Sequence, residues 1–591
     1  MGSGIKIGLE IHQRLNTGKL FCRCPHANKN GPLFTIKRRL HSVRSELGEE
    51  DVAAVQEEMR GKEFTYEVYD NCCLVELDEE PPHEMDHTAL LVALAVSRYL
   101  NADIPDRIYV MRKAVIDGSN TSGFQRTSIV SLGGALTVGD RKIGIQTLCL
   151  EEESAGIVED GNGARFALNR LGIPLIEIAT EPCITSGEEA REVALAIGMM
   201  LRMTGMAARG IGTIRQDLNI SIPGGARVEI KGVQELDEIP LIVEREAQRQ
   251  KKLIEILPRV PKMPPAATFD TVDITECAKN AKGWLAKAVA GGARAVAVKL
   301  PGLKGIMGTE LFAGRRYGTE VSDYARPFGF GGMIHGDEDL SKYGLDRTAV
   351  EAAIGASGND SYAILVGAND RRMQLAFREI VRRAYMREVP SETRKSLGGG
   401  DTRYMRPMAT GARMYPETDV KAIDVTSEML AEAAKYAPKD PAEILKMLEM
   451  QTNRELAEQL LRSKYLQAYL SAVERGANPT IAAVTFTNTL RTLSREGLPV
   501  ESLDDEVIIE AVLLCSSGEI TKKAVEQVLR EVLSKKVGVR QAVELGGLLR
   551  ITGKELDALI AREGEDPKKI LSKYRLQVDA EELMQKLGGK K

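Results

Sequence analysis

The stretch Ile5-Lys6-Ile7-Gly8-Leu9-Glu10-Ile11-His12 alternates apolar and polar residues. Because successive side chains of a β-strand point to opposite faces, this alternation predicts a half-buried strand with the apolar side chains inward. Glu10 and His12 would then lie together on the polar face. Taken alone, such a pair is explained most simply by ion pairing that stabilises the fold.

Two further strand-like segments place carboxylates beside apolar residues, Leu148–Glu153 and Pro174–Ile178. They carry Glu151, Glu152 and Glu177. Burying a carboxylate without a partner costs free energy, so each needs a cation or a metal ion nearby. Carboxylate oxygens suit Mg²⁺, which often bridges to phosphates, whereas histidine is a less usual Mg²⁺ ligand. Pairing with Arg or Lys remains the alternative.

A β-hairpin with one polar face is predicted between Ile214 and Lys231. One face of the first strand carries Arg215, Asp217, Asn219 and Ser221, and the return strand carries Arg227, Glu229 and Lys231. Polar residues must pair with polar residues, so the numbers of paired residues sum to an even value. Asn219 therefore pairs with Glu229 or Lys231 and not with Ile230. Such a face either meets solvent or lines a cleft.

Composition describes an ordinary soluble multidomain protein. The chain has 591 residues, 43% hydrophobic and 28% charged, with a net charge of -4. This length suggests roughly three to five domains. Any RNA contact must then come from local basic patches. The segment after Met1 has no apolar signal region, no stretch is long enough to span a bilayer, and eight cysteines are too few for a disulfide scaffold, so we expect a reducing cytoplasm.

Changes in composition and in the pattern of apolar residues along the chain predict its domain organisation. We expect a mixed or antiparallel-sheet cradle over 1–271 and 389–425, interrupted by an α+β module over 272–388. Within that module we predict a helix over Cys277–Ala290 and buried strands at Ala293–Leu300 and Tyr362–Val366. The run Tyr404–Asp419 looks irregular. Helical domains are expected over 426–510 and 511–591.

In the cradle, Ser186 to Glu189 predicts a capping box for a helix ending near Gly205. No phosphate-binding glycine loop is present, so ATP would need another architecture. Cys22, Cys24, Cys72 and Cys73 do not have the usual C-x₂₋₄-C spacing, which argues against a zinc site.

These motifs, in this order, resemble the B and E subunits of tRNA-dependent amidotransferases, the GatB/GatE family. The match covers residues 5 to about 425 and is specific. It rests on Gly8–Cys22, Leu150–Gly156, Leu168–Pro182, Arg215–Ser221, Val228–Lys231, Met405-Arg406 and Arg413–Asp419. The segment after Arg112-Lys113 departs from the B-subunit pattern, so some nucleotide or acceptor-end contacts differ.

The module at 272–388 separates the two subunit types, because B subunits lack it. It is similar to the insertion domain of bacterial aspartyl-tRNA synthetase and points to the archaeal E type. That resemblance implies that Glu-tRNA(Gln) is bound, its γ-carboxylate is phosphorylated by ATP with Mg²⁺, and ammonia then gives Gln-tRNA(Gln). Ammonia would come from a D subunit, an asparaginase-like glutaminase, in a dimer of heterodimers.

Site roles are carried over by position. The metal candidates are Glu10, His12, Glu151, Glu152 and Glu177, of which Glu10, His12, Glu152 and Glu177 are also the catalytic candidates. The substrate and nucleotide pocket would be lined by Arg112, Lys113, Asn169, Arg170, Arg215, Asp217, Asn219 and Lys231. Two other classes stay open: a non-catalytic tRNA-binding scaffold and an aminoacyl-tRNA synthetase relative. Clustered carboxylates favour an enzyme, because a scaffold that binds phosphates avoids them.

Overall fold

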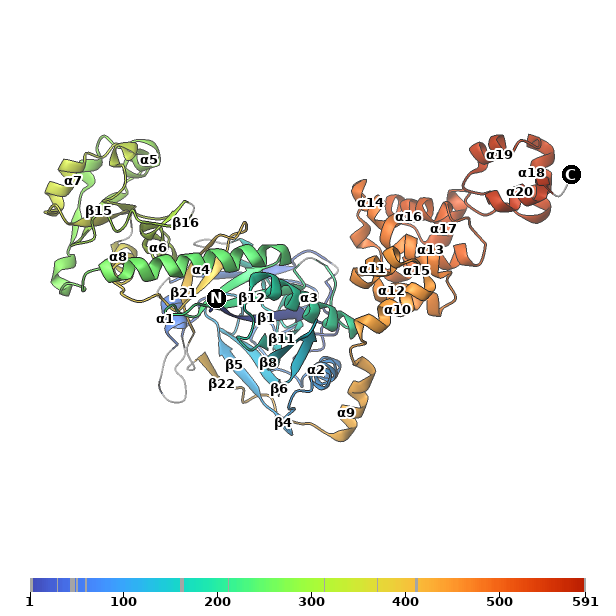
Figure 1. The fold of residues 1–591 in the computed structure, drawn as a ribbon, viewed down its shortest axis with the longest axis horizontal. Coiled ribbons are helices and arrows are strands. Elements are labelled where there is room, and N and C mark those ends of the chain that lie inside the picture. Colours follow the sequence, from blue (N-terminus) through green and yellow to red (C-terminus); the bar gives the residue numbers. More distant parts are fainter. Residues whose placement is uncertain are drawn as a thin grey trace. The chain divides into compact units, whose positions relative to one another are not determined.

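The structure is a computed structural model that describes residues 4–28, 30–42, 48, 51–58, 61–159, 164–210, 212–312, 314–368, 370–409 and 413–588. The chain forms two compact units, Met1–Pro438 and Lys439–Lys591 (Figure 1). A search of the described helices finds none that combines the length and apolarity needed to cross a membrane.

A large mixed sheet organises the first unit. In the part of the chain that is described it has 11 strands, all antiparallel to their neighbours except β13 and β20. The strand order is β21 (Thr402–Pro407), β20 (Glu392–Ser396), β13 (Val228–Val233), β12 (Ile214–Ser221), β1 (Lys6–Arg14), β11 (Pro174–Thr180), β8 (Arg141–Glu152), β6 (Phe124–Leu132), β5 (Val110–Ala114) and β22 (Met414–Pro416), with β7 (Ala135–Val138) beside β8. The predicted mixed sheet is confirmed.

Strand β1 lies in the middle of this sheet and has the predicted alternation. Ile7, Leu9 and Ile11 are buried in the main core, which α2 (His87–Tyr99), α3 (Gly187–Met203) and α4 (Ile239–Ile256) complete on one face. Glu10 and His12 point to the other face, which we call the cleft face. The core-facing side chains thus fix which face of β1 remains for chemistry.

Helix α3 begins as the sequence predicts, at the N-cap Ser186, whose hydroxyl accepts a hydrogen bond from the Glu189 amide. The reciprocal half of the capping box is absent. Instead, the Glu189 carboxylate accepts hydrogen bonds from Thr185 and pairs with Arg141. The cation competes for that carboxylate, and the helix still ends at Met203, close to Gly205.

The β12–β13 hairpin has the predicted register. Asn219 is opposite Glu229, and Leu218 is opposite Ile230. Leu218 and Ile230 are fully buried against the helices, while the polar partners lie on the cleft face. A bulge between Gln216 and Leu218 shifts the pairing toward the end of the hairpin.

A second, four-stranded sheet also belongs to the first unit. Its order is β2 (Phe34–Arg38), β3 (Phe64–Val68), β10 (Arg165–Ala167) and β9 (Gly156–Glu159). Phe64, Tyr66 and Phe166 form its core. Nearby in sequence are α1 (Val52–Glu58) and the 3₁₀ turn η1 (Leu168–Arg170), which leads into β11.

The inserted module is an α+β layer structure with a four-stranded sheet. Its strands are β14 (Thr271–Asp273), β15 (Arg294–Leu300), β19 (Ser361–Gly367) and β18 (Ile334–His335), and its helices are α5 (Gly283–Ala290), α6 (Tyr317–Asp323), α7 (Arg347–Ile354) and α8 (Asp370–Ala384). A short β16 (Glu310–Phe312) and β17 (Arg315–Arg316) pair separately. Both faces of β15 and β19 are covered by apolar side chains, which explains their continuous apolar runs.

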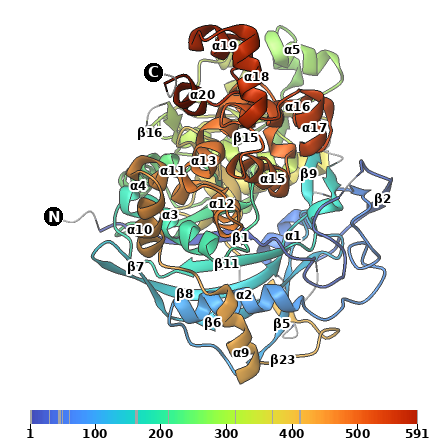
Figure 2. The ribbon, with the colours of Figure 1, turned by 90° about the vertical axis from the view of Figure 1, so that its right-hand side faces the viewer.

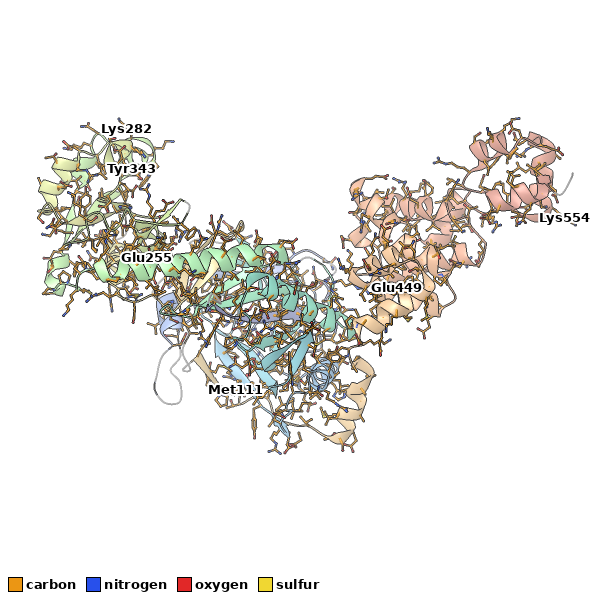
Figure 3. All side chains as sticks on the ribbon, viewed as in Figure 1. Met111, Glu255, Lys282, Tyr343, Glu449 and Lys554 are labelled. Atoms are coloured by element: carbon orange, nitrogen blue, oxygen red, sulfur yellow. The ribbon has the colours of Figure 1, made fainter. Side chains whose placement is uncertain are left out.

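The predicted helix over Cys277–Ala290 is wrong in its first half. A 3₁₀ turn covers Thr275–Ala278, and α5 begins only at Gly283. Gly283 has φ of +62°, which only glycine adopts readily, and this breaks the helical path. Figure 3 labels Lys282 just before that break and Tyr343, whose carbonyl accepts a 2.8 Å hydrogen bond from the Lys282 amide.

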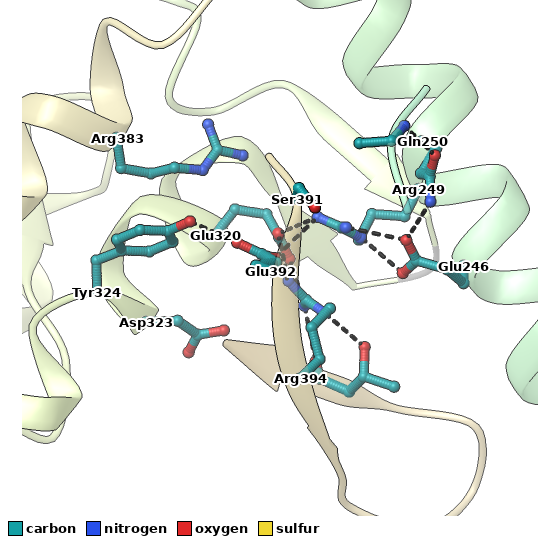
Figure 4. Close-up of polar contacts among 12 residues, drawn as sticks. Glu246, Arg249, Gln250, Glu320, Asp323, Tyr324, Arg383, Ser391, Glu392 and Arg394 are labelled. Carbon is teal, nitrogen blue, oxygen red and sulfur yellow. Dashed lines mark hydrogen bonds and ion pairs between the residues drawn. The ribbon is translucent and has the colours of Figure 1, made fainter. Parts of the chain in front are cut away.

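A buried network of charges joins the inserted module to α4 and β20 (Figure 4). The Arg249 guanidinium on α4 donates to Glu246 at 2.8 Å and to Glu320 on α6 at 2.7 Å. Arg394 on β20 reaches the same Glu320 at 3.0 Å and pairs with Glu392. All five side chains are essentially inaccessible to solvent. Paired charges therefore hold these elements in one arrangement.

Apolar contacts support the same junction. The last turns of α4 contribute Leu253 and Ile256 to the core that packs under β15 and α8. The module and the cradle therefore share a helix, whose exposed end is marked by Glu255 in Figure 3.

The run Tyr404–Asp419, predicted to be irregular, contains strands β21 and β22 at the two ends of the large sheet. β22 pairs with β5, where Tyr415 is opposite Arg112. Two prolines made these short strands look irregular in the sequence. Proline is nevertheless tolerated in an edge strand, where its missing N–H leaves no hydrogen bond of the sheet unformed. Two strands that are close in the sequence thus form the two opposite edges of the large sheet.

Helical structure begins at Ser427 as expected, with Thr426 capping α9 (Ser427–Ala433). Helix α9 packs against α2, as Figure 2 shows, and the first unit extends to Pro438. β4 (Arg107–Ile108) and β23 (Ile423–Asp424) pair just before it.

The second unit, Lys439–Lys591, is entirely helical in its described part. Its helices are α10 (Pro441–Gln451), α11 (Arg454–Arg462), α12 (Leu466–Glu474), α13 (Pro479–Val484), α14 (Leu490–Arg495), α15 (Asp505–Ser516), α16 (Ala524–Lys535), α17 (Val539–Leu545), α18 (Gly553–Glu563), α19 (Pro567–Tyr574) and α20 (Ala580–Gly588). The apolar side chains of α16 are buried along one stripe, Ala524, Val525, Val528, Leu529, Val532 and Leu533. Glu449 and Lys554 mark this unit in Figure 3.

Candidate active site

Two groups of acidic side chains lie next to each other on the cleft face of the large sheet. One consists of His12, Glu151 and Glu177, and the other of Glu10, Asp217 and Glu229; within each group the possible ligand atoms lie within 4.8 Å of one another. Strand pairing brings them together, because β1 runs between β11 and β12. His12 is opposite Glu177, and Glu10 is opposite Asp217.

The first group, which we call the histidine group, is balanced by a lysine. His12 Nε2 is 3.0 Å from Glu177, and the Lys113 ammonium is 2.5 Å from Glu151 and 3.7 Å from Glu177. Burial opposes a charge on His12, but the Glu177 hydrogen bond outweighs it and raises the pKa of His12 to about 8. Burial also opposes ionisation of Glu177, yet Lys113 and His12 lower its pKa. At neutral pH this group carries paired charges of both signs.

The second group, which we call the acidic triad, is not balanced. The Lys231 ammonium contacts Asp217 at 2.7 Å and Glu229 at 2.6 Å, while Glu10 accepts only a neutral hydrogen bond from Asn219 at 2.9 Å. Burial raises the pKa of Glu10 to about 7, and Lys231 offsets only part of that effect. Burial acts in the same direction on Asp217 and Glu229, but Lys231 lowers the pKa of each below its usual value.

The acidic triad fits a divalent cation better than the histidine group does. Three carboxylates face one ammonium, so an ion of charge +2 would neutralise the remainder. The donors are all hard oxygens, which Mg²⁺ prefers. The raised pKa of Glu10 is the mark of a carboxylate whose charge lacks compensation. In the histidine group, Lys113 already supplies the countercharge.

Glu152, predicted to share a metal site with Glu151 and Glu177, lies apart from them in the structure. Neighbouring residues of a strand point to opposite faces, and Glu152 pairs with Arg126 at 3.4 Å. Arg112, predicted to line the nucleotide pocket, belongs to the same separate cluster. Its guanidinium donates to Glu417 at 2.6 Å, and Glu417 also accepts from Arg126 at 2.8 Å.

Arg215 lies beside the histidine group, and Arg170 lies near Arg14 at the end of β1. Arg215 is opposite His12 and donates to Glu153 at 2.9 Å, and Arg14 contacts the same carboxylate at 3.3 Å. The Arg170 Nε atom is buried and has no hydrogen-bond partner among the described residues. Asn169 is directed elsewhere and donates to Asn28 at 3.3 Å.

Three of the four cysteines that were considered for a zinc site lie close together despite their unfavourable spacing in the sequence. Cys22, Cys24 and Cys73 form a possible metal-binding group with Glu76, and Cys72 is not part of it. The spacing of these cysteines along the chain therefore did not indicate that three of their sulfur atoms lie close together. Cys22 donates to Glu76 at 2.9 Å, and burial raises the pKa of its thiol. Lys19 pairs with the same carboxylate at 3.1 Å.

Glu229 completes the acidic triad, although the sequence indicated only its place on the polar hairpin face. Its partner Thr393 comes from β20 and donates to it at 2.8 Å. No local pattern could indicate this contact, because 164 residues separate the two. Arg126 and Glu417 were missed for the same reason, since their pairing needs β6 and the segment after β22 to meet.

Two family models match most of the chain. Residues 5–431 match the GatB/GatE catalytic domain and residues 465–587 match the GatB domain. The chain belongs to the GatB/GatE family.

Its relatives include proteins named as the E subunits of glutamyl-tRNA(Gln) amidotransferases. That of Pyrobaculum calidifontis is 42% identical over 99% of this chain and 98% of its own length. Those of Archaeoglobus fulgidus and Aeropyrum pernix are 41% and 42% identical, over 99% and 94% of this chain and 97% and 90% of their own lengths.

Proposed function

We propose that the chain is the subunit of a glutamyl-tRNA(Gln) amidotransferase that activates glutamate on Glu-tRNA(Gln) for conversion to Gln-tRNA(Gln). Family membership makes it part of a tRNA-dependent amidotransferase, an ATP-dependent ligase of protein biosynthesis. The observation that carries the chemical part is the juxtaposition of the acidic triad and the histidine group on one sheet face.

The reaction needs two chemical steps, phosphorylation of the γ-carboxylate and then its amidation. A γ-carboxylate oxygen of the tRNA-bound glutamate attacks the γ-phosphorus of ATP, and the bond to the ADP oxygen breaks. Ammonia then attacks the resulting acyl phosphate, phosphate leaves with the electron pair of its C–O bond, and a proton is lost from nitrogen. Phosphate is a better leaving group than the oxygen of the unactivated γ-carboxylate, which is why ATP is required.

Glu10, Asp217 and Glu229 would hold Mg²⁺. When bound, that ion supplies positive charge to the phosphate oxygens. Lys231 keeps Asp217 and Glu229 ionised and in place, and Asn219 orients Glu10. Glu151 and Glu177 of the histidine group continue the acidic surface beside the triad. Glu152 remains an ion-pair partner of Arg126 and has no role at the metal.

The histidine group would receive the reacting carboxylate. Lys113 and protonated His12 place two positive charges beside Glu151 and Glu177, so an incoming anion meets a neutral group instead of bare carboxylates. Arg215, opposite His12, and Arg170, which interacts electrostatically with Arg14 at the end of β1, would contact phosphate oxygens. Arg112 and Asn169 would not contact the substrate directly. They would support the wall of the pocket through their hydrogen bonds to Glu417 and Asn28.

Ammonia would come from a separate asparaginase-like glutaminase, the D subunit, in a dimer of heterodimers. Burial raises the pKa of the Cys22 and Cys149 thiols, which leaves both in the unreactive protonated form. The likeness of the module at 272–388 to the aspartyl-tRNA synthetase insertion domain belongs to the same proposal, as do the tRNA contacts of the helical unit and a cytoplasmic location.

Combining the chain with its glutaminase partner, Glu-tRNA(Gln), Mg²⁺-ATP and glutamine tests the proposal. We expect Gln-tRNA(Gln) and ADP in equal amounts, and ADP that depends on Glu-tRNA. AMP would instead support a synthetase relative. Tight tRNA binding without any nucleotide turnover, even with ammonium present, would leave a non-catalytic scaffold.

A further inference from the structure

The inserted module carries the single tryptophan of the chain, and this residue lies on the surface. Trp284 is the second residue of α5 and is 54% exposed. The next residue, Leu285, is completely buried in the core of the module. Because tryptophan has a large apolar surface, it is mostly buried in folded proteins or lies at an interface. Helix α5 thus directs Leu285 inward and the indole of Trp284 outward.

Helix α5 covers one face of the module's sheet, and α4 lies on the opposite face. Leu285 belongs to the same core as Ala297 of β15, whereas Val298 of the same strand belongs to the core that contains Leu253 of α4. Successive residues of a strand point to opposite faces. Figures 1 and 2 show α5 at the end of the module away from α4. The exposed indole is therefore separate from the junction with the cradle and from both acidic groups.

Tyr343 supports the indole of Trp284 from one side. The two rings meet edge to face, with their centroids 6.4 Å apart and their planes at 78°. Tyr343 is itself fixed, because its hydroxyl donates to Glu338 at 2.7 Å and its carbonyl accepts the Lys282 amide at 2.8 Å. Trp284 is thereby held in one orientation with half of its surface in solvent. A ring that is already fixed loses little conformational entropy when a flat ligand stacks on it.

Two exposed lysines flank the indole. Lys282 precedes Trp284 by two residues, and Lys287 follows three residues later on the same face of α5. Neither lysine forms an ion pair or a side-chain hydrogen bond with any residue that the structure describes. A further lysine of this segment, Lys279, pairs with Glu276. The segment 276–292 contains three lysines against one glutamate, so its surface is positively charged.

The acids of the adjoining segment 338–346 do not neutralise these two lysines. The carboxylates of Glu338, Asp339 and Asp346 accept local hydrogen bonds from a tyrosine hydroxyl and from two backbone amides. They stabilise the turns of their own segment. The ammonium groups of Lys282 and Lys287 consequently remain available for an anionic partner.

An exposed indole between unpaired lysines favours RNA over a protein as the partner. Tryptophan is enriched in protein interfaces, but lysine is depleted there. Proteins that bind single-stranded nucleic acid combine cations, which contact the phosphates, with aromatic rings on which bases stack. Stacking on a side chain requires an unpaired base, because the bases of a duplex already stack on their neighbours.

We propose that Lys282, Trp284 and Lys287 form an RNA-binding surface of the inserted module, which we call the tryptophan surface. An unpaired base of a tRNA loop stacks on the indole, and the lysines contact the flanking phosphates. The inference rests on the proposed function, because tRNA is the RNA that the enzyme binds.

The stacked base belongs to the body of the tRNA. The glutamate is esterified to the 3′ end, so that end lies at the acidic groups during the reaction, and α5 lies on the other side of the module. The acceptor stem is a duplex and offers no free base. The unpaired bases that remain are those of the loops. The tryptophan surface is therefore a second contact, independent of the one that positions the reacting group.

The intrinsic fluorescence of the full chain tests the proposal, because the only tryptophan is the one in question. The chain is titrated, without its glutaminase partner, with tRNA(Gln) and with a two-strand duplex that reproduces only the acceptor stem and its 3′ end. We expect intact tRNA to quench the emission of Trp284 and to protect the indole from acrylamide, and the duplex to do neither. Unchanged emission at saturating tRNA, or equal quenching by the duplex, would overturn the proposal.

Variants separate the stacking contribution from the charge contribution. Trp284→Ala should weaken binding of tRNA(Gln) by about 5-fold or more, as expected for one lost stacked base, and Trp284→Phe should retain most of the affinity. Lys282→Ala/Lys287→Ala keeps the indole and should lower the salt slope of log K by about 1.4. The matched control Lys142→Ala/Lys304→Ala removes two exposed lysines elsewhere and should leave Kd and salt slope unchanged. Unchanged tRNA affinity in both Trp284→Ala and the Lys282/Lys287 variant would contradict the assignment.

Two further titrations distinguish other partners. Heparin carries negative charge but no bases, so quenching by heparin equal to that by tRNA would overturn the stacking of a base. A change in emission on addition of the glutaminase partner, with no change on addition of tRNA, would make the tryptophan surface a protein interface.

Amidation separates this inference from the proposed function. If the wild-type complex forms Gln-tRNA but tRNA does not alter the emission of Trp284, only the tryptophan surface fails. If the wild-type complex forms no Gln-tRNA with either glutamine or ammonium, the proposed function fails. The expected result is amidation by the wild type, and a raised KM for Glu-tRNA with an unchanged KM for ATP in Trp284→Ala.

Discussion

At the residue scale, the distribution of charge around β1 decides what each carboxylate can do. Glu10 has only a neutral partner, Glu152 is neutralised by Arg126, and Glu177 is stabilised by two cations. Three acids that look equivalent in the sequence therefore have different protonation behaviour. The acidic triad is set apart by its excess negative charge.

Glu177→Gln should abolish amidation with free ammonium, by at least about 100-fold in kcat, and leave tRNA binding intact. The substitution removes the negative partner of both His12 and Lys113, so two cations lose their orientation. Single-turnover formation of Gln-tRNA measures the effect. Glu188→Gln, on an exposed surface of α3, is the matched control and should retain activity. Activity retained by the Glu177 variant would contradict this role.

The pH dependence of metal binding should report Glu10. Its raised pKa of about 7 means that the folded protein holds a proton there over roughly pH 4.5 to 7. Stability contributed by the protonated form is therefore lost as the pH rises through this range, and Mg²⁺ affinity increases over the same range. Titration of Mg²⁺ at pH 6 and pH 8 should show tighter binding at pH 8.

Glu10→Gln should remove this pH dependence, because the amide does not titrate. The variant should bind Mg²⁺ weakly at both pH values and should be more stable than wild type above pH 7 without metal, as judged by Tm. An equally steep pH dependence in the variant would assign the titration to another group.

At the element scale, two predictions from the sequence are explained by packing and two fail for identifiable reasons. The hairpin register and the core face of β1 follow from alternation, because a shift by one residue would bury charges. The helix over 277–290 fails at Gly283, and β21 and β22 were missed because short edge strands have weak patterns.

The buried charge network at the junction of α4, α6 and β20 should be sensitive to loss of one member. Glu320→Gln leaves Arg249 and Arg394 buried without full compensation, and breaking such a network costs about 3–5 kcal/mol. We expect the thermal transition of Met1–Pro438 to fall by several degrees. Glu458→Gln breaks an exposed pair with Arg454 and should change stability by less than about 0.5 kcal/mol.

At the scale of the whole molecule, the chain consists of two compact units with separate interiors. The first contains the large sheet, the inserted module and both acidic groups, and the second contains only helices in its described part. The inserted module shares a core and a charge network with the cradle. Both acidic groups and the inserted module therefore belong to a single unit.

Calorimetry of the full chain should show two unfolding transitions, because each unit has its own core. Mg²⁺ should raise only the transition of Met1–Pro438, since a ligand stabilises the unit that binds it. The separately produced segment Lys439–Lys591 should be helical by circular dichroism and insensitive to Mg²⁺. A single transition that shifts as a whole with Mg²⁺ would contradict this independence.

The sequence by itself determined the strands that carry Glu10, Glu177 and Asp217, their polar face and the family, because alternation and ordered motifs are local properties. Only the tertiary structure decided which acids share a site. It joined Glu10 to Asp217 and Glu229, turned Glu152 toward Arg126, and aligned Lys231 with Lys395 and Arg403. The physical reason is that strand order and register bring distant segments within ångströms, and the local pattern of no single strand encodes its neighbour.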